Sequence, residues 1–146
     1  MAEAVFLVDI AAPAARVREA LTSRDGLMGW WTDDVEIEGG TISLGFSDAP
    51  ERFSLRIDTE SADLVRWTSV GEFPPHWVET RVSWTVMDDP GSNGVKVFFE
   101  HAGFASPDPM LGHTAMVWAN LMNSLKGFCE TGRPSPLLTG PRETQS

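Results

Sequence analysis

Residues 110–131 read MLGHTAMVWANLMNSLKGFCET and decide the fold. The side chains of one face recur there every three or four residues, at Leu111, Thr114, Trp118, Leu121, Leu125 and Phe128. This spacing predicts a long amphipathic helix. Gly132 is placed to end that helix, because glycine readily adopts the left-handed conformation after a last helical turn, and Pro134 prevents its continuation. Such a helix needs a large apolar surface to cover.

A series of predicted strands supplies that surface. Apolar and polar side chains alternate in residues 53–57, 63–70, 77–86 and 95–101, as is typical of strands with one face in water. Two further alternating segments, 34–38 and 41–46, flank Gly39 and Gly40. Paired glycines predict a tight hairpin because both tolerate positive φ angles.

The N-terminal residues predict a strand over 4–11, a short helix over 14–21 that opens after Pro13, and a second helical turn over 27–31. The whole order predicts an α+β domain. In it, a curved antiparallel sheet of about six to seven strands wraps around the C-terminal helix, with two short helices after the first strand. We expect residues 1–132 to form this single domain and the Pro-rich, polar residues 133–146 to fray.

The composition bounds the class of partner. The chain has 146 residues and a net charge of -10, which argues against nucleic acid and against anionic membrane surfaces. We expect the acidic run from Asp33 to Glu38 to be a solvated rim rather than a metal site. Cys129 is the sole cysteine, so no intrachain disulfide can form, and no apolar run resembles a signal peptide or a membrane span. These features predict a cytoplasmic protein, and no motif indicates a cofactor.

Large aromatic side chains collect on the predicted interior face. The chain has six Trp, eight Phe and no Tyr. An apolar cavity between sheet and helix would be lined by Trp67, Trp84, Phe99, Trp118, Leu121, Met122 and Leu125. We expect Trp30 at its mouth and Trp31 exposed. The alternative is an interior that these side chains fill, which is the better reading for each residue taken separately.

His101 shares its strand face with Val97 and Phe99 and is the one weak catalytic candidate. It could act as a general base in an apolar pocket, or it could be a histidine whose hydrogen bonds are satisfied locally. His76 and His113 lack the close spacing of zinc ligands, so no metal site is predicted. Cys129 lies near a helix C-terminus, which disfavours a thiolate, and we expect an inert thiol.

Charged side chains on the strands are expected to face solvent. Arg56, Arg66 and Arg81 alternate with interior positions, unless a bulge reverses the register and turns a guanidinium toward a ligand carboxylate. Phe98 lies on the outer face of the last strand and hints at a covered patch, such as a dimer interface.

Four stretches, taken in order, resemble the START-like helix-grip superfamily, also called SRPBCC. The closer likeness is to its branch of homologues of the activator of the heat-shock-protein-90 ATPase. The stretches are residues 8–21 with their Ala-Pro helix start, the pair Trp30-Trp31, residues 94–104, and the end of the long helix with Pro134 and Pro136 beyond it. The resemblance implies a fold with a deep cavity and a family of divergent functions. Eukaryotic members that act on the chaperone carry an additional N-terminal domain, which these residues do not include.

Three functions follow as hypotheses. The first is binding of a small hydrophobic or aromatic molecule in an apolar cavity. The second is a cyclase or dehydratase type of enzyme that uses a cavity histidine. The third is a chaperone cofactor or regulatory domain that binds a protein partner or a second copy of itself. No catalytic motif is visible, which favours a non-enzymatic role.

Overall fold

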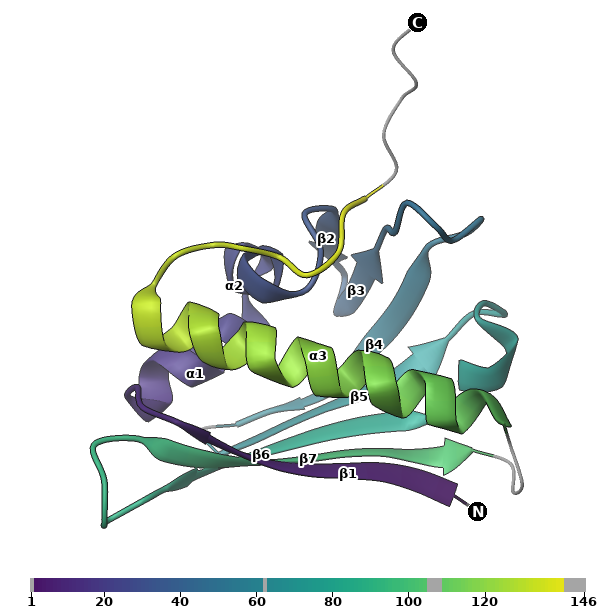
Figure 1. Cartoon of the computed structure of the whole chain (residues 1–146). Coiled ribbons are helices and arrows are strands. Elements are labelled where there is room, and N and C mark those ends of the chain that lie inside the picture. Colours follow the sequence, from purple (N-terminus) through teal and green to yellow (C-terminus); the bar gives the residue numbers. More distant parts are fainter. Residues whose placement is uncertain (1, 62, 105–108, 141–146) are drawn as a thin grey trace, which may run out of the picture.

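The computed structural model in Figure 1 describes residues 2–61, 63–104 and 109–140. In chain order the elements are β1 (Ala2–Ile10), α1 (Ala14–Thr22), α2 (Arg24–Trp30), β2 (Val35–Glu38), β3 (Thr41–Leu44), β4 (Phe53–Glu60), β5 (Leu64–Val70), the 3-10 turn η1 (Pro75–Trp77), β6 (Arg81–Asp88), β7 (Val95–Phe104) and α3 (Pro109–Thr131). This order confirms the predicted α+β architecture.

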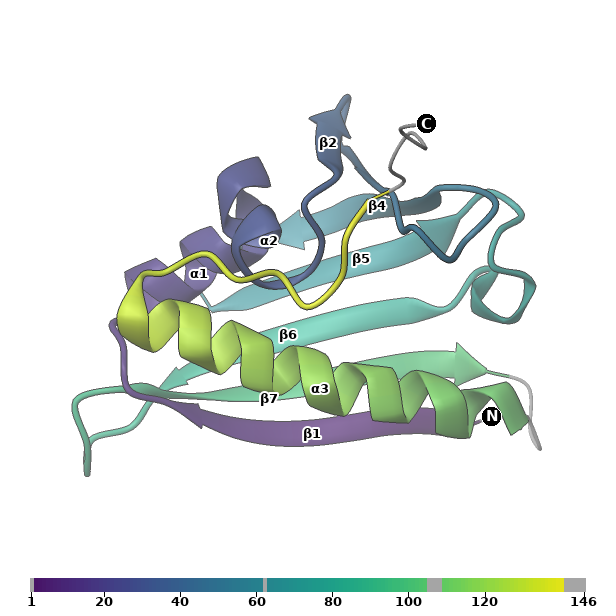
Figure 2. The ribbon, with the colours of Figure 1, turned by 45° about the horizontal axis from the view of Figure 1, so that its top comes forward.

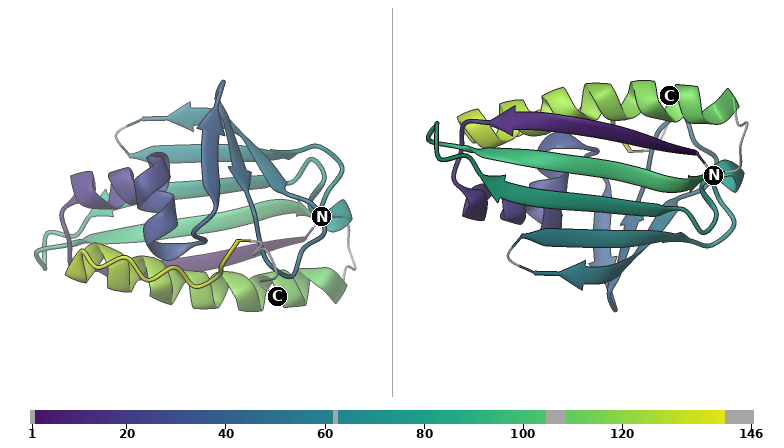
Figure 3. Two further views of the ribbon diagram at one scale, coloured as in Figure 1. Left: turned by 90° about the horizontal axis from the view of Figure 1, so that it is seen from above. Right: turned by 90° about the horizontal axis from the view of Figure 1, so that it is seen from below.

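The strands form one antiparallel sheet of seven strands in the order β1-β7-β6-β5-β4-β3-β2. Figures 1 and 2 show that the sheet curves and that α3 lies across its concave face, with α1 and α2 on the same side. Seen from below, the opposite face carries no helix (Figure 3). None of the helices in the described part of the chain is long and apolar enough to cross a membrane.

The predicted alternation places the core. Val82, Trp84 and Val86 of β6 are buried, and the Trp84 ring packs on Trp118 of α3 at 5.8 Å, whereas Arg81 is exposed. Arg56 and Arg66 are exposed as well, so the predicted register of these strands is correct. The buried core includes Trp118, Leu121 and Leu125 of α3.

The strand predicted over residues 77–86 begins four residues later than expected, at Arg81. Trp77 belongs to η1 instead, and Val78 is 41% exposed. Glu79 has a φ of 62°, which interrupts the extended backbone before β6. The Thr80 hydroxyl then donates to the Trp77 carbonyl at 2.6 Å and fixes the turn. Alternation of side chains cannot reveal such a local reversal.

Residues 133–140, which we name the C-terminal strap, do not fray as predicted. The N–H groups of Ser135, Leu137 and Leu138 donate to the carbonyls of Gly29, Trp30 and Trp31. Those carbonyls belong to the last turn of α2, where a helix has no partners of its own for its C=O groups. The strap therefore docks because it completes the end of α2. Residues 141–146 of the predicted tail lie outside the described residues.

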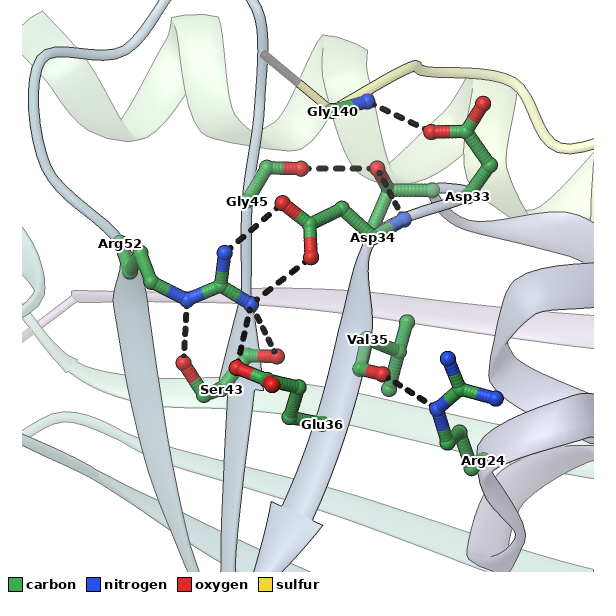
Figure 4. A network of polar contacts seen from close by, with 10 residues as sticks. Arg24, Asp33, Asp34, Val35, Glu36, Ser43, Gly45, Arg52 and Gly140 are labelled. Carbon is green, nitrogen blue, oxygen red and sulfur yellow. Dashed lines mark hydrogen bonds and ion pairs between the residues drawn. The ribbon is translucent and has the colours of Figure 1, made fainter.

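A polar network holds the far end of the strap (Figure 4). The Gly140 N–H donates to Asp33 Oδ1 at 2.7 Å. Arg52 binds both carboxylate oxygens of Asp34, at 2.7 and 3.0 Å, and this hydrogen bonding lowers the pKa of Asp34. Arg52 also donates to the Ser43 hydroxyl at 2.6 Å. The start of the acidic run is thus a structural tie rather than a solvated rim.

Candidate functional site

The space between the sheet and the middle of α3 is filled by side chains. Trp30, Trp67, Trp84 and Phe99 are all fully buried. Their rings pack on one another, with centroids 5.7 Å apart for Trp30 and Trp84, 5.7 Å for Trp67 and Trp84, and 4.6 Å for Trp84 and Phe99. Met122 and Leu125 belong to the same core. The centre of the molecule is therefore packed at the place where the sequence predicted an open space.

An apolar pocket of about 400 Å³ lies nearer the N-terminal end of α3. Its walls come from α3, from the end of α2, from the segments around β4 and η1, and from the strap. The lining residues are Trp31, Phe46, Asp48, Ala49, Pro50, Phe53, Phe73, Pro74, His76, Trp77, Met110, His113, Thr114, Val117, Trp118, Leu121 and Leu138. Two residues of the predicted lining, Trp118 and Leu121, are among them.

Larger hollows exist on the surface but are less suited to hold a molecule. One of about 590 Å³ lies over the outer face of the sheet and is lined by Arg56, Asp58, Arg81 and their neighbours. Two of its charges already pair, because Arg56 donates to Asp58 at 2.8 Å. A shallow polar hollow buries little of a ligand, whereas the apolar pocket can enclose one.

Five aromatic side chains form a closed belt at this pocket. Trp31 contacts Phe46, which contacts Phe53, which contacts Trp77. Trp77 stacks parallel to Trp118, and Trp118 contacts Trp31, which closes the belt. The centroids of successive rings lie 4.8 to 6.4 Å apart, which is the usual range for aromatic pairs. Phe73 packs on Phe53 outside the belt.

A buried chain of hydrogen bonds stands behind two rings of the belt. The Trp118 Nε1–H donates to His101 Nδ1 at 3.0 Å, and His101 Nε2 lies 2.8 Å from the Thr80 hydroxyl. An indole N–H can only donate, so Nδ1 must be the acceptor and Nε2 must carry the imidazole proton. The Thr80 hydroxyl then accepts a hydrogen bond from Nε2 and donates one to the Trp77 carbonyl.

This arrangement keeps His101 neutral. Burial, together with a smaller effect of the nearby His76, lowers the pKa of His101 to about 3. Its one lone pair is used by Trp118, and His101 is not among the residues that line the pocket. The side chain predicted as a weak catalytic candidate therefore has no free base to offer. Its observed contacts hold Trp118 and the Trp77 backbone in position.

Neither of the two adjacent tryptophans lies where it was predicted. Trp30 was expected at the mouth, yet it is fully buried and its Nε1–H donates to the Ala20 carbonyl at 2.8 Å. Trp31 was expected to be exposed, yet it is 1% exposed and lines the pocket. Trp31 stacks on Trp30 at 5.3 Å, and the Leu138 N–H of the strap donates to the Trp31 carbonyl, a contact that local sequence could not foresee.

Sequence reasoning also missed the polar side chains of the pocket. The spacing of His76 and His113 argued against metal ligands, yet both side chains line the pocket together with Asp48. The signal available was the Phe73–Trp77 stretch, FPPHW, in which aromatic residues sit on a rigid proline turn. Within the described residues, no three His, Cys, Asp or Glu side chains gather as a metal site would require. Cys129 is buried, and burial raises the pKa of its thiol to about 12, which confirms an inert cysteine.

Comparison with solved structures identifies the fold. The chain superposes on the Aha1 dimer structure from Colwellia psychrerythraea with a TM-score of 0.80 and 26% identity, over 90% of this chain and 98% of that one. The chain has an Aha1-like helix-grip fold of the SRPBCC superfamily.

Other helix-grip structures are more distant. DynU16, a protein in the dynemicin biosynthetic locus, matches with a TM-score of 0.70 and 22% identity, over 90% of this chain and 48% of that one. CalU16 from Micromonospora echinospora matches with a TM-score of 0.67 and 19% identity, over 89% of this chain and 77% of that one. No known family matches the sequence of this helix-grip protein, and no curated protein does so either.

Proposed function

We propose that this helix-grip protein binds a small hydrophobic or aromatic molecule in the pocket bounded by the aromatic belt. One observation carries the proposal: five aromatic side chains close a ring of contacts at a space of about 400 Å³. Ligand pockets are commonly apolar, have volumes from about 300 Å³ upward, and hold a few polar groups that set orientation. Asp48, His76, His113 and Thr114 are such groups here.

The buried network supports a binding role more than a catalytic one. His101 holds Trp118 through a 3.0 Å hydrogen bond, and the Trp77 Nε1–H donates to Thr114 Oγ1 at 3.4 Å. These contacts fix two walls before any ligand arrives. A preformed wall lowers the entropy lost on binding, because the side chains need not be ordered by the ligand. The activity that we propose is therefore binding in a preformed pocket, without a reaction.

Neighbouring positions on α3 provide the test. Val117 lines the pocket, whereas Met116 is 70% exposed outside it. Nile red, a neutral aromatic dye, should bind the wild-type protein with increased emission. Val117→Phe should fill the pocket and weaken dye binding about tenfold or more, which corresponds to about 1.4 kcal/mol. Met116→Phe adds the same ring to the same helix and should leave the affinity unchanged.

Equal dye affinity in the two folded variants would contradict the proposal. The proposal would also be contradicted if the wild-type protein bound neither the dye nor any of a series of neutral aromatic competitors. The pocket would then be a packing defect rather than a ligand site.

A second proposal concerns self-association through the outer face of the sheet. Leu7 is 61% exposed and Val5 is 47% exposed, and Leu7 lies opposite the half-buried Phe98 in the register of β1 and β7. The related Aha1 structure from Colwellia psychrerythraea is that of a dimer. Both observations support a homodimer that covers these apolar side chains.

A further inference from the structure

Apart from the two histidines, His76 and His113, the charged side chains that line the pocket are of one sign. The described residues that line it include the carboxylate of Asp48 and no lysine or arginine. The chain as a whole carries 21 Asp and Glu against 11 Lys and Arg. Arg52 lies near this end of the molecule, but its guanidinium is engaged by Asp34, Glu36 and Ser43. A ligand carboxylate would therefore meet no lysine or arginine in these walls.

The belt itself favours positive charge. The face of an aromatic ring is electrostatically negative, and a cation within about 6 Å of a ring centroid is attracted to it. Six aromatic side chains line this pocket, and Trp, the best of these rings for the purpose, supplies Trp31, Trp77 and Trp118. The interplanar angles vary from 12° to 74° around the belt, so the rings present faces and edges in several directions.

The hydrogen-bonding capacity of the walls limits the kind of cation. A primary ammonium carries three donors that need acceptors when it is buried. The Thr114 hydroxyl already accepts from Trp77 and has one further lone pair, Asp48 is exposed at the rim, and most other lining side chains are apolar. A quaternary ammonium has no N–H group and spreads its charge over methyl groups, so it can enter an aromatic pocket without leaving a donor unsatisfied.

We infer that the ligand of this pocket is a small apolar molecule bearing a quaternary ammonium or a similar fully substituted cation. The inference rests on the proposed function and narrows it to one chemical class. The belt contacts the cation, Asp48 at the rim adds electrostatic attraction, and the remaining apolar lining, such as Val117 and Leu121, covers the rest of the ligand.

Three matched probes test the inference by displacement of Nile red. Each carries a naphthyl ring, joined by a methylene to a trimethylammonium, to its uncharged carbon isostere with a tert-butyl group, or to a carboxylate. The assay is run at pH 8. We expect the ammonium probe to bind about tenfold more tightly than the carbon isostere, and the carboxylate probe to bind most weakly.

A charge-matched pair of variants locates the effect. Asp48→Asn should reduce the preference for the ammonium over the isostere by about threefold, because it removes a partly exposed charge pair. Glu38→Gln removes the same charge at an exposed position of β2 that does not line the pocket, and should leave the preference unchanged.

Each other outcome overturns a defined claim. If the carbon isostere binds as tightly as the ammonium, or the carboxylate binds best, the cationic ligand class is wrong while the apolar pocket stands. If Glu38→Gln lowers the preference as much as Asp48→Asn does, the selectivity comes from net charge and the assignment to this pocket is wrong. If none of the probes displaces a bound dye, the cationic ligand class is wrong while the apolar pocket stands. If the wild-type protein binds neither the dye nor any probe, both the inference and the proposed function fail.

Discussion

At the scale of single residues, His101 is the group whose protonation the fold opposes most. Its pKa is about 3 in the folded protein, where burial disfavours the charged form, and an unfolded histidine has a pKa near 6.5. Between these values the unfolded chain binds a proton that the folded chain does not, so stability decreases as the pH falls. We expect the free energy of unfolding to drop by about 1.4 kcal/mol for each pH unit below 6.5.

Urea unfolding at pH 7, 6 and 5 measures this slope above the range in which the Asp34 carboxyl, with its lowered pKa, takes up a proton. His101→Gln should remove most of the slope, whereas His113→Gln, at an exposed position, should retain it. If His101→Gln does not fold, imidazole nitrogen NMR of the wild-type protein replaces it. A protonated His101 at pH 5 would contradict the hydrogen-bond assignment.

At the same scale, the sequence predicts the burial of some residues but not of others. Alternation correctly predicted the burial of Trp84 and Phe99, because strand geometry places every second side chain inward. Trp31 could not be predicted in this way. It is the C-cap of α2, where regular periodicity ends, and its burial depends on a strap more than a hundred residues away.

At the scale of elements, the strap is the part of the pocket wall that can be tested most directly. Gly140 is buried, and a Cβ placed there would lie 2.3 Å from the Cβ of Asp34. Gly140→Ala should therefore displace the end of the strap and lower the free energy of unfolding by about 1–3 kcal/mol. Because Leu138 lines the pocket, Nile red should also bind less tightly.

Gly127 provides the matched control for this substitution. It lies in α3, and a Cβ there meets no atom within 4 Å. Gly127→Ala should raise the stability by about 1 kcal/mol, since alanine is the better helix former. A Gly140→Ala variant as stable as Gly127→Ala would show that the strap does not dock as described.

The elements also separate what is predictable from what is not. Residues 110–131 were predicted as a helix from their own spacing, and α3 covers Pro109–Thr131. Besides α3, the pocket is lined by η1, the segments beside β4, the end of α2 and the strap. These segments do not share one repeating pattern of side chains. Local patterns therefore predicted the sheet and helix that carry the site, but placed the open space at their centre rather than at one end.

At the scale of the whole molecule, the sheet is covered by helices on one face only. In the described part of the chain the helices lie on the concave face, and the outer face carries none (Figure 3). Leu7 and Val5 are exposed, and Phe98, opposite Leu7 in the register, is half-buried. A twofold dimer would bury the same patch on both copies, and a stable one needs about 1,000 Å² of buried surface in total. Two chains that each carry a charge of -10 repel one another, so added salt should strengthen the dimer by screening.

Light scattering after size exclusion should therefore give a dimer mass that becomes more populated as the salt concentration is raised. Leu7→Glu places a charge in the patch and should yield a monomer. Met116→Glu adds the same charge at an exposed position of α3 and should remain dimeric. A wild-type protein that stays monomeric at high concentration and high salt would contradict the dimer. A dimer that Leu7→Glu leaves intact would place the interface on another surface, with the outer face of the sheet exposed to solvent.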